Sequence, residues 1–338
     1  MTPMTRRKEM LAFSRPSLGD EEIAEILHSM RSGWITTGPK CARFEQDVCE
    51  YVGAKHAVAL SSATAGLHLA LLAAGVGPGD EVITTSMTFA ATANVVALVG
   101  ATPVFVEIRD DLNIDPACIE AAVTPRTKAV IPVHFAGYPC DMERILEIAR
   151  RRNLVVIEDA AHAIGTEYRG RRIGSLGAMT VFSFHPIKNI TTGEGGMLVT
   201  DDPALAEKVR LLKFHGIQKD AWKRYGGKEI PQYEIHFPGF KYNLTDLQAA
   251  LGIHQLKKLD GFIEIRTRLA ARYRALLAGA PGILLPVTPL EEGIRHCWHL
   301  FVVLVDIDRL TIDRDRLRLE GRDRRKLEGD PNPDKPDP

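Results

Sequence analysis

The sequence predicts an α/β fold in which a mostly parallel central sheet is covered on both faces by helices. Short apolar runs rich in β-branched residues alternate with amphipathic stretches from about residue 56 onward. The runs are apolar almost throughout, which is typical of strands buried on both faces. Polar residues of catalytic types follow the ends of two runs, where parallel sheets bind their ligands.

The predicted strands and helices alternate along the chain, as in proteins built from βαβ units. The predicted strands are residues 56–60, 81–85, 102–108, 129–133, 154–157, 180–184 and 197–200. The predicted helices are residues 64–74, 89–98, 114–122 and 142–151. Together they predict one large domain over residues 1–250.

A smaller C-terminal domain is predicted to follow. Residues 244–277 have helical periodicity, and Leu259-Asp260-Gly261 predicts a break, because glycine weakens a helix interior. Residues 300–305 (LFVVLV) predict a strand, so residues 251–312 are expected to form an α+β domain. Residues 313–338 are dense in charge and proline, which predicts a disordered tail and leaves the small domain incomplete.

The composition excludes several classes of function. Lysine plus arginine equal aspartate plus glutamate at 43 each, so no whole-chain field attracts nucleic acid or an anionic membrane. No apolar run reaches the roughly 18 residues of a membrane helix, and the N-terminus lacks the apolar region of a secretion signal. The five cysteines are scattered without a CxxC pair, which predicts a reduced cytoplasmic protein with neither a zinc site nor a disulfide scaffold.

A carboxylate and a lysine carry the strongest chemical signal. Asp159 follows a predicted strand, and Lys188 lies 29 residues later on a loop that leaves another strand. A pyridoxal phosphate (PLP) enzyme needs this pair, because a lysine forms the Schiff base and a carboxylate keeps the pyridine nitrogen protonated. Each residue also has an ordinary alternative: a helix cap for the aspartate and a solvated surface group for the lysine.

Eight stretches carry a resemblance to a known family. They are GWITTGP (33–39), SSATAGLHLAL (61–71), GDEVITTSMTFAATAN (79–94), GATPVFVEI (100–108), IEDAAHAIG (157–165), FSFHPIKNITTGEGG (182–196), FHGI (214–217) and KYNLTDLQAALG (241–252). On these residues the chain resembles the DegT/DnrJ/EryC1/StrS sugar aminotransferases, which have the type I PLP aminotransferase fold. The resemblance is to members of the family that form UDP-4-amino-4-deoxy-L-arabinose or UDP-4-amino-4,6-dideoxy-N-acetylhexosamines.

The resemblance implies a catalytic role for Lys188 and cofactor contacts for its neighbours. Lys188 would form the Schiff base and carry the proton between Cα and C4′. Asp159 would pair with the pyridinium nitrogen. His162 would approach the phenolic oxygen of PLP, although a buried, hydrogen-bonded core histidine is the alternative.

The resemblance also implies a phosphate site and a stacking residue. Thr64 and the N–H group of Ala65 would bind the PLP phosphate where a strand runs into a helix, and Ser183 would add a hydroxyl. Phe89 matches the aromatic position that stacks on the pyridine ring. The alternatives are a simple helix N-cap in the sequence SSATAG and a core phenylalanine.

A shared active site is implied by residues 241–243. Lys241 stands where many relatives place an asparagine that reaches the PLP phosphate of the neighbouring subunit, and Asn243 stands two residues later. The assignment between the two stays open, with a solvated lysine and a helix-capping asparagine as alternatives. Either role would make the protein a homodimer with shared sites, and residues 33–39 would line the sugar pocket.

The implied reaction is transamination of a nucleotide-linked 4-keto sugar, with L-glutamate as amino donor, in the synthesis of lipopolysaccharide or another surface polysaccharide. A PLP-dependent sugar dehydratase of the same family is the alternative, but those enzymes carry histidine in place of Lys188. Relatives continue with further strands and helices where this chain has its charged tail. A chain altered after about Asp313 could instead be a non-catalytic homologue.

Overall fold

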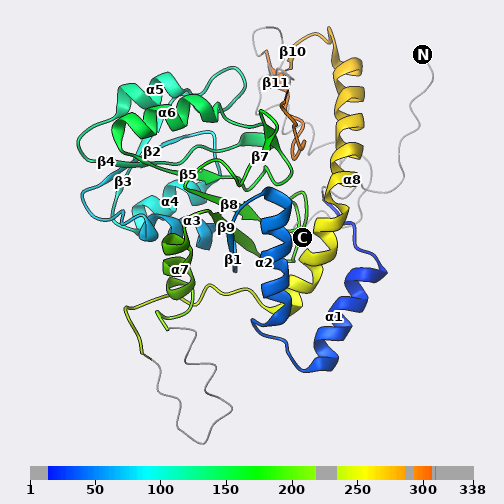
Figure 1. The fold of residues 1–338 in the computed structure, drawn as a ribbon. Coiled ribbons are helices and arrows are strands. Elements are labelled where there is room, and N and C mark those ends of the chain that lie inside the picture. Colours follow the sequence, from blue (N-terminus) through cyan, green and yellow to red (C-terminus); the bar gives the residue numbers. More distant parts are fainter. Residues whose placement is uncertain (1–13, 218–233, 286–292, 307–308, 310–338) are drawn as a thin grey trace, which may run out of the picture.

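The structure is a computed structural model that describes residues 14–217, 234–285, 293–306 and 309. Seven strands form its central sheet (Figure 1). They are β1 (His56–Leu60), β2 (Glu81–Thr85), β3 (Thr102–Val106), β4 (Thr127–Val130), β5 (Val155–Asp159), β8 (Met179–Ser183) and β9 (Gly196–Thr200). Each coincides with a predicted strand to within a few residues.

The sheet is mostly parallel, as predicted. Its strand order is β1-β9-β8-β5-β4-β2-β3. The strands β8, β5, β4, β2 and β3 pair in parallel, whereas β9 is antiparallel to both of its neighbours. Because β5 and β8 are parallel neighbours, their carboxyl ends lie side by side, and the loops that follow them meet at one edge.

Helices cover both faces of the sheet (Figure 1). One layer contains α3 (Ala63–Ala73), α4 (Ala90–Leu98) and α7 (Pro203–Leu212); the other contains α2 (Pro39–Val52), α5 (Pro116–Ala122), α6 (Met142–Arg152) and α8 (Asp246–Leu277). Strand residues alternate between the two layers: Val58 and Leu60 pack with the first, Ala57 and Ala59 with the second. All four are buried, which explains the continuous apolar runs in the sequence.

The remaining elements are small or peripheral. Helix α1 (Asp20–Ser32) packs on α8. Two short antiparallel pairs are formed by β6 (Glu167–Tyr168) with β7 (Arg171–Arg172), and by β10 (Ile283–Leu284) with β11 (Leu304–Val305). A 3-10 turn, η1 (Phe135–Gly137), lies beside the carboxyl end of β5.

The predicted break in the long helix is wrong. Helix α8 runs without interruption over 32 residues through Gly261. Leu259 and Ile263 are buried in the core on either side of the glycine, and Asp260 accepts a hydrogen bond from Tyr51 at 2.8 Å. This packing outweighs the roughly 1 kcal/mol by which glycine disfavours a helix.

The strand predicted at residues 300–305 is confirmed only at its end, in β11. Leu300 donates its N–H to the oxygen of Ala136 at 3.2 Å, so this segment lies against η1 instead of a partner strand. The predicted domain boundary at residue 250 lies inside α8 and stays a proposal. The predicted disordered tail, residues 313–338, lies outside the described residues.

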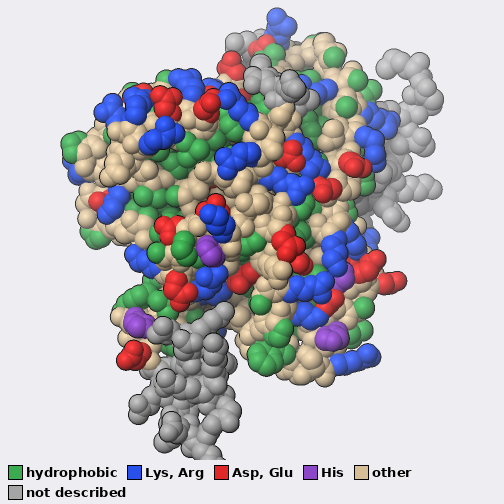
Figure 2. All heavy atoms as spheres, in the orientation of Figure 1, with side chains coloured by type: hydrophobic (Ala, Val, Ile, Leu, Met, Phe, Trp, Pro, Cys, Tyr) green, Lys and Arg blue, Asp and Glu red, His purple; other side chains and the backbone are tan. Residues whose placement is uncertain are grey.

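The surface mixes charges of both signs. On the face shown in Figure 2, lysine and arginine side chains lie among aspartate and glutamate side chains. This distribution agrees with the equal totals of basic and acidic residues in the sequence. Within the described part of the chain, every helix is too short or too polar to cross a membrane.

Two glycines of α8 allow a test of how its packing governs stability. A Cβ at Gly252 would lie 2.5 Å from the ring of Phe44, which is fully buried, so Gly252→Ala should lower the free energy of unfolding by about 1–3 kcal/mol. Gly261 has nothing within 4 Å of such a Cβ, so Gly261→Ala should raise it by about 0.5–1 kcal/mol. Urea unfolding of both variants measures the difference, and two shifts of the same sign would contradict this account.

Candidate active site

A cavity of about 320 Å³ lies at the carboxyl ends of the central strands. Its walls come from the ends of β5 and β8, the start of α3 and the loops before α4 and after β8. Six residues predicted to form the site line it: Thr64, Phe89, Asp159, His162, Ser183 and Lys188. The structure thus brings these distant residues together around one cavity, and their roles stay predictions.

Asp159 is the last residue of β5 and is buried. Its Oδ2 accepts a hydrogen bond from the hydroxyl of Thr92 at 2.8 Å, and its Oδ1 accepts one from the N–H of Ala161 at 3.2 Å. Burial raises the pKa of Asp159, while these two bonds and the charge of Lys188 act in the opposite direction. The carboxyl group is thus fixed in place and faces the cavity.

Thr92 is a site residue that the sequence analysis missed. Its hydroxyl also lies 2.7 Å from that of Thr88, which is four residues earlier in the loop that leads into α4. Because Thr92 donates its hydrogen to Asp159, Thr88 must be the donor in this second bond. A signal was present in the sequence, since Thr92 lies in the first turn of a helix that follows a strand, where parallel sheets bind their ligands.

Lys188 lies on the loop that follows β8 and is half-buried. Its backbone N–H donates to the oxygen of His185 at 2.8 Å, which turns the loop back toward the sheet. Burial lowers the pKa of the Lys188 amine, and the charge of Asp159 partly opposes this shift. The neutral amine, which is the nucleophilic form, is consequently easier to reach than in a solvated lysine.

His162 reaches the cavity from the loop after β5. Its Nδ1 accepts the N–H of Ala136 at 3.3 Å, so in the neutral ring the hydrogen is on Nε2. Burial, with a smaller contribution from the charge of Lys188, lowers the pKa of His162 to about 3. The residue combines both alternatives from the sequence: it is a hydrogen-bonded, largely buried histidine and it also lines the cavity.

The start of α3 lies at another wall of the cavity. Ser62 is the N-cap, and its hydroxyl oxygen accepts the N–H of Ala65 at 3.1 Å. Ala65 is buried, whereas Ala63 and Thr64 line the cavity. The amide predicted to bind phosphate is therefore already used by the cap, and the first-turn amides of Ala63 and Thr64 lie closer to the cavity.

Phe89 and Ser183 complete the predicted set in this cavity. The Phe89 side chain is 75% exposed, so it is not a core residue. It stands at the cavity wall just before α4, where a flat ligand could stack on it. Ser183, the last residue of β8, is buried, and its hydroxyl oxygen accepts the N–H of His185 at 3.5 Å.

Lys241 and Asn243 line a different cavity, of about 460 Å³. The Lys241 Nζ lies 4.4 Å from the ring centre of Phe214 and donates to Asn243 Oδ1, while Asn243 Nδ2 donates to Thr37 Oγ1 at 2.7 Å. Trp34, half-exposed, lines the same cavity. Residues of segment 33–39, which is predicted to line the sugar pocket, therefore lie next to Lys241 and Asn243. Lys188 of the same chain lines the other cavity.

The comparisons with known proteins agree with this geometry. The model described as the DegT/DnrJ/EryC1/StrS aminotransferase family matches residues 16–328. The chain belongs to this family. Enzymes of the family use PLP, and the chain is accordingly a PLP-dependent sugar aminotransferase with the type I fold.

Similar proteins act in sugar and polysaccharide biosynthesis. The chain is 51% identical over 313 residues to the spore coat polysaccharide biosynthesis protein SpsC of Bacillus subtilis, covering 92% of this chain and 80% of SpsC. DesV of S. venezuelae, solved with a ketimine intermediate, is 41% identical with a TM-score of 0.79, over 90% of this chain and 77% of DesV. Helicobacter pylori PseC, an aminotransferase of pseudoaminic acid biosynthesis, is 34% identical with a TM-score of 0.85, over 94% of this chain and 83% of PseC.

The raised pKa of Asp159 predicts a specific pH dependence of stability. The folded chain holds this proton more tightly than the unfolded chain, so the group's contribution is complete below 3.8 and is lost as pH rises through the raised value. Asp159→Asn removes that loss. The Tm of the cofactor-free variant minus that of wild type should therefore increase as pH rises from about 4.

Asp260→Asn is the matched control, with the opposite sign. Burial raises the pKa of Asp260, but hydrogen bonds from Tyr51 and Arg295 outweigh it and lower the pKa overall. For this variant the Tm difference from wild type should become more negative as pH rises. A flat or falling difference for Asp159→Asn, measured by scanning fluorimetry, would show that its carboxyl is not destabilised by burial.

Proposed function

We propose that this chain transfers the amino group of L-glutamate to the keto carbon of a nucleotide-linked 4-keto sugar, with Lys188 as the catalytic amine. The observation that carries this proposal is that Lys188 and the buried Asp159 line one cavity and interact electrostatically. The names of SpsC and PseC support a product used in surface polysaccharide or another bacterial sugar.

The residues of the cavity fit PLP. Bound PLP supplies a conjugated ring that withdraws electrons from the substrate carbon. Asp159 would hold the pyridine nitrogen, since it is the buried carboxyl of the cavity and is kept in place by Thr92 and Ala161. Its burial also strengthens any interaction with a protonated nitrogen, because the local dielectric constant is low.

Lys188 performs the acid–base work in this proposal. Its amine has a pKa lowered by burial, so it can exist in the neutral form needed to bind the cofactor and then to accept a proton. Its Nζ would accept the proton that the amino donor loses at Cα, and would hold that proton until it returns it to the reacting molecule. The same amine serves the sugar half-reaction in reverse.

The remaining contacts hold the two ends of the cofactor. The first-turn amides of Ala63 and Thr64, together with the positive end of the α3 dipole, suit the phosphate, and the hydroxyl of Ser183 adds a donor. His162, with its hydrogen on Nε2, can donate to the phenolic oxygen. Phe89 offers an exposed ring for stacking on the pyridine.

A sugar dehydratase is disfavoured because Lys188 stands where those relatives have histidine, and the similar solved structures are aminotransferases.

A cytoplasmic location is favoured because the five cysteines are free thiols, as in a reducing compartment.

We also propose that the enzyme is a homodimer with shared active sites. Asp246, buried at the start of α8, accepts the N–H groups of Gly38, Lys40 and Cys41 at 2.8–3.0 Å and so fixes residues 34–41 against residues 241–246. The resulting cavity is lined by the cationic side chains of Arg210, Lys213 and Lys241 and by the amide of Asn243, which suit an anionic ligand. A second subunit's phosphate site would supply one.

Transfer of ¹⁵N from labelled glutamate tests the reaction directly. Wild type should place the label on the sugar when offered UDP- or dTDP-linked 4-keto sugars, and the preferred nucleotide identifies the substrate. Lys188→Ala should lower turnover by roughly 10⁴-fold or more and remove the visible band of the lysine-bound cofactor. The exposed Lys257→Ala is the control and should match wild type; label transfer by Lys188→Ala would refute the assignment.

Subunit mixing tests the shared site. Lys188→Ala and the double variant Lys241→Ala/Asn243→Ala should each be inactive as homodimers. If residues 241 and 243 act across the interface, a mixed dimer contains one intact site, and random mixing should restore roughly a quarter of wild-type activity. No recovery after confirmed exchange of subunits would show that these residues act within their own chain.

A further inference from the structure

We propose that His299 is a positioning residue, which ties the C-terminal segment of residues 296–299 to the cofactor cavity by holding both His162 and the neighbour of Lys188. The inference rests on the proposed function, because it assigns a role relative to that cavity. His299 is separated from Lys188 by more than 100 residues of sequence, and it was not among the predicted site residues.

The first contact joins two imidazole rings. The ring of His299 lies 4.3 Å from that of His162, with an angle of 32° between the planes. His162 is held from its other side by the N–H of Ala136. Its ring therefore has an orientation defined by η1 and by His299, and this orientation determines where its Nε2–H points in the cavity.

The second contact reaches the residue next to the catalytic lysine. Asn189 is buried, and its Nδ2 donates to the oxygen of Cys297 at 3.2 Å. Its Oδ1 therefore faces His299 Nδ1 at 3.1 Å, which places the hydrogen of His299 on Nδ1. Two hydrogen bonds thus join the loop of Lys188 to the C-terminal segment.

Other contacts hold this segment firmly. Arg266 of α8 donates through Nη1 to the oxygens of Trp298 and His299 at 3.0 and 3.2 Å. The thiol of Cys297 donates to the oxygen of His162 at 3.0 Å. These contacts hold the backbone of residues 297–299 in place, which favours a role for His299 in aligning His162 and Asn189.

Backbone strain marks the same place. Trp298 and Ala136 have positive φ angles of 51° and 57°, which are rare for residues other than glycine. Each such residue costs about 1–3 kcal/mol and persists only where surrounding contacts impose it. One directly precedes His299 and the other donates to His162, so the strain lies on both sides of the paired rings.

The pair of rings is neutral. Burial lowers the pKa of His299 to about 2, with smaller contributions from His162, Lys188 and Arg266. Burial likewise lowers the pKa of His162. Two neutral rings can pack closely without repelling Lys188, so the contact orients groups without changing the charge of the cavity.

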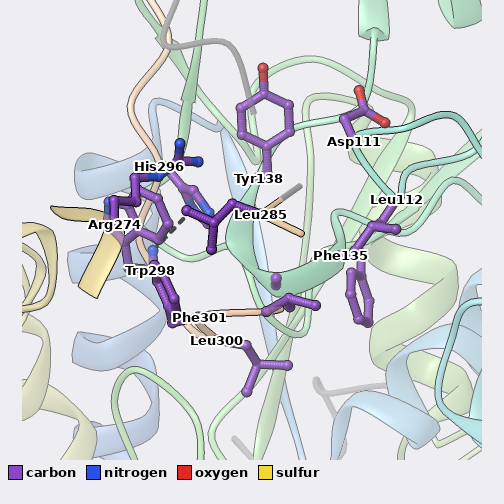
Figure 3. Close-up of a pocket in the computed structure, with 12 residues that line it drawn as sticks. Asp111, Leu112, Phe135, Tyr138, Arg274, Leu285, His296, Trp298, Leu300 and Phe301 are labelled. Atoms are coloured by element: carbon purple, nitrogen blue, oxygen red, sulfur yellow. Dashed lines mark hydrogen bonds between the residues drawn. The ribbon is translucent and has the colours of Figure 1, made fainter. Parts of the chain in front are cut away.

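The other side of the segment supplies a matched control. In Figure 3, His296 and Trp298 lie with Arg274 on one side of a small pocket, and Asp111, Leu112 and Phe135 lie on the other. His296 is as buried as His299, but its ring stacks on Trp298 at 3.8 Å and not on His162. A substitution at His296 therefore perturbs the same segment without touching the cofactor cavity.

Two variants separate the contacts of His299. His299→Phe retains an aromatic ring against His162 and loses the donor to Asn189, whereas His299→Asn can retain the donor and loses the ring. We expect either variant to lower kcat by roughly 10- to 100-fold, as displaced catalytic groups do, while KM for glutamate changes less than about threefold. His299→Asn should also alter the visible circular dichroism of the lysine-bound cofactor more than His299→Phe does, and His296→Phe should leave both readings near wild type.

A purely structural role would give a different result. In that case His299→Phe, His299→Asn and His296→Phe would lose activity in proportion to their loss of Tm, or none would lose activity; either result overturns the inference. Arg266→Gln provides an independent variant that keeps both rings, and it should lower kcat in the same direction. A wild type without the cofactor band or amino transfer would overturn the proposed function itself, whereas an active wild type matched by both His299 variants would overturn this inference alone.

Discussion

The burial of one carboxyl group, that of Asp159, is the constraint on which the rest of the site depends. The group lies at the end of a central strand, and its charged form is disfavoured there. Hydrogen bonds from Thr92 and Ala161 and the charge of Lys188 offset part of this cost. The strand order explains why these groups are available: β8 is the parallel neighbour of β5, so the loop that carries Lys188 starts beside Asp159.

The neighbouring carboxylate shows how alternation along a strand separates structure from chemistry. Glu158 points to the opposite face of the sheet from Asp159. There it accepts hydrogen bonds from the buried His134 at 2.9 Å and Thr180 at 2.8 Å and from the partly buried Gly177 at 2.7 Å. Its hydrogen-bonding capacity is used inside the protein. The two adjacent acidic residues thus have different roles: Glu158 makes hydrogen bonds inside the protein, and Asp159 faces the cavity.

The sequence predicted the sheet and six of the cavity residues because these features are local. Continuous apolar runs identify buried strands, and strand ends identify where polar residues gather. The misses have two causes: packing against distant residues and a local helix cap that competes with the ligand for an N–H group. The glycine of α8 was taken as a break, but Leu259 and Ile263 are held by the core. The N–H of Ala65 was assigned to a ligand, but the hydroxyl of Ser62 accepts it. Contacts such as that of His299 with His162 have no local pattern at all.

Backbone pairing links the cavity of Lys188 to the cavity lined by Lys241 and Asn243. Leu60 pairs with Asn243, and the N–H of Ser61 donates to the oxygen of Tyr242 at 2.8 Å. Ser61 leads into the loop that begins α3, where the proposed phosphate site lies, and Tyr242 stands between the two residues proposed to reach the partner subunit. A displacement of either segment must move or break this bond. In the proposed dimer, Ser61 would lead into the phosphate loop of its own subunit, and residues 241–243 would reach the phosphate loop of the partner. Because Ser61 and Tyr242 are hydrogen-bonded, dimer assembly and cofactor binding would stabilise the same stretch of backbone.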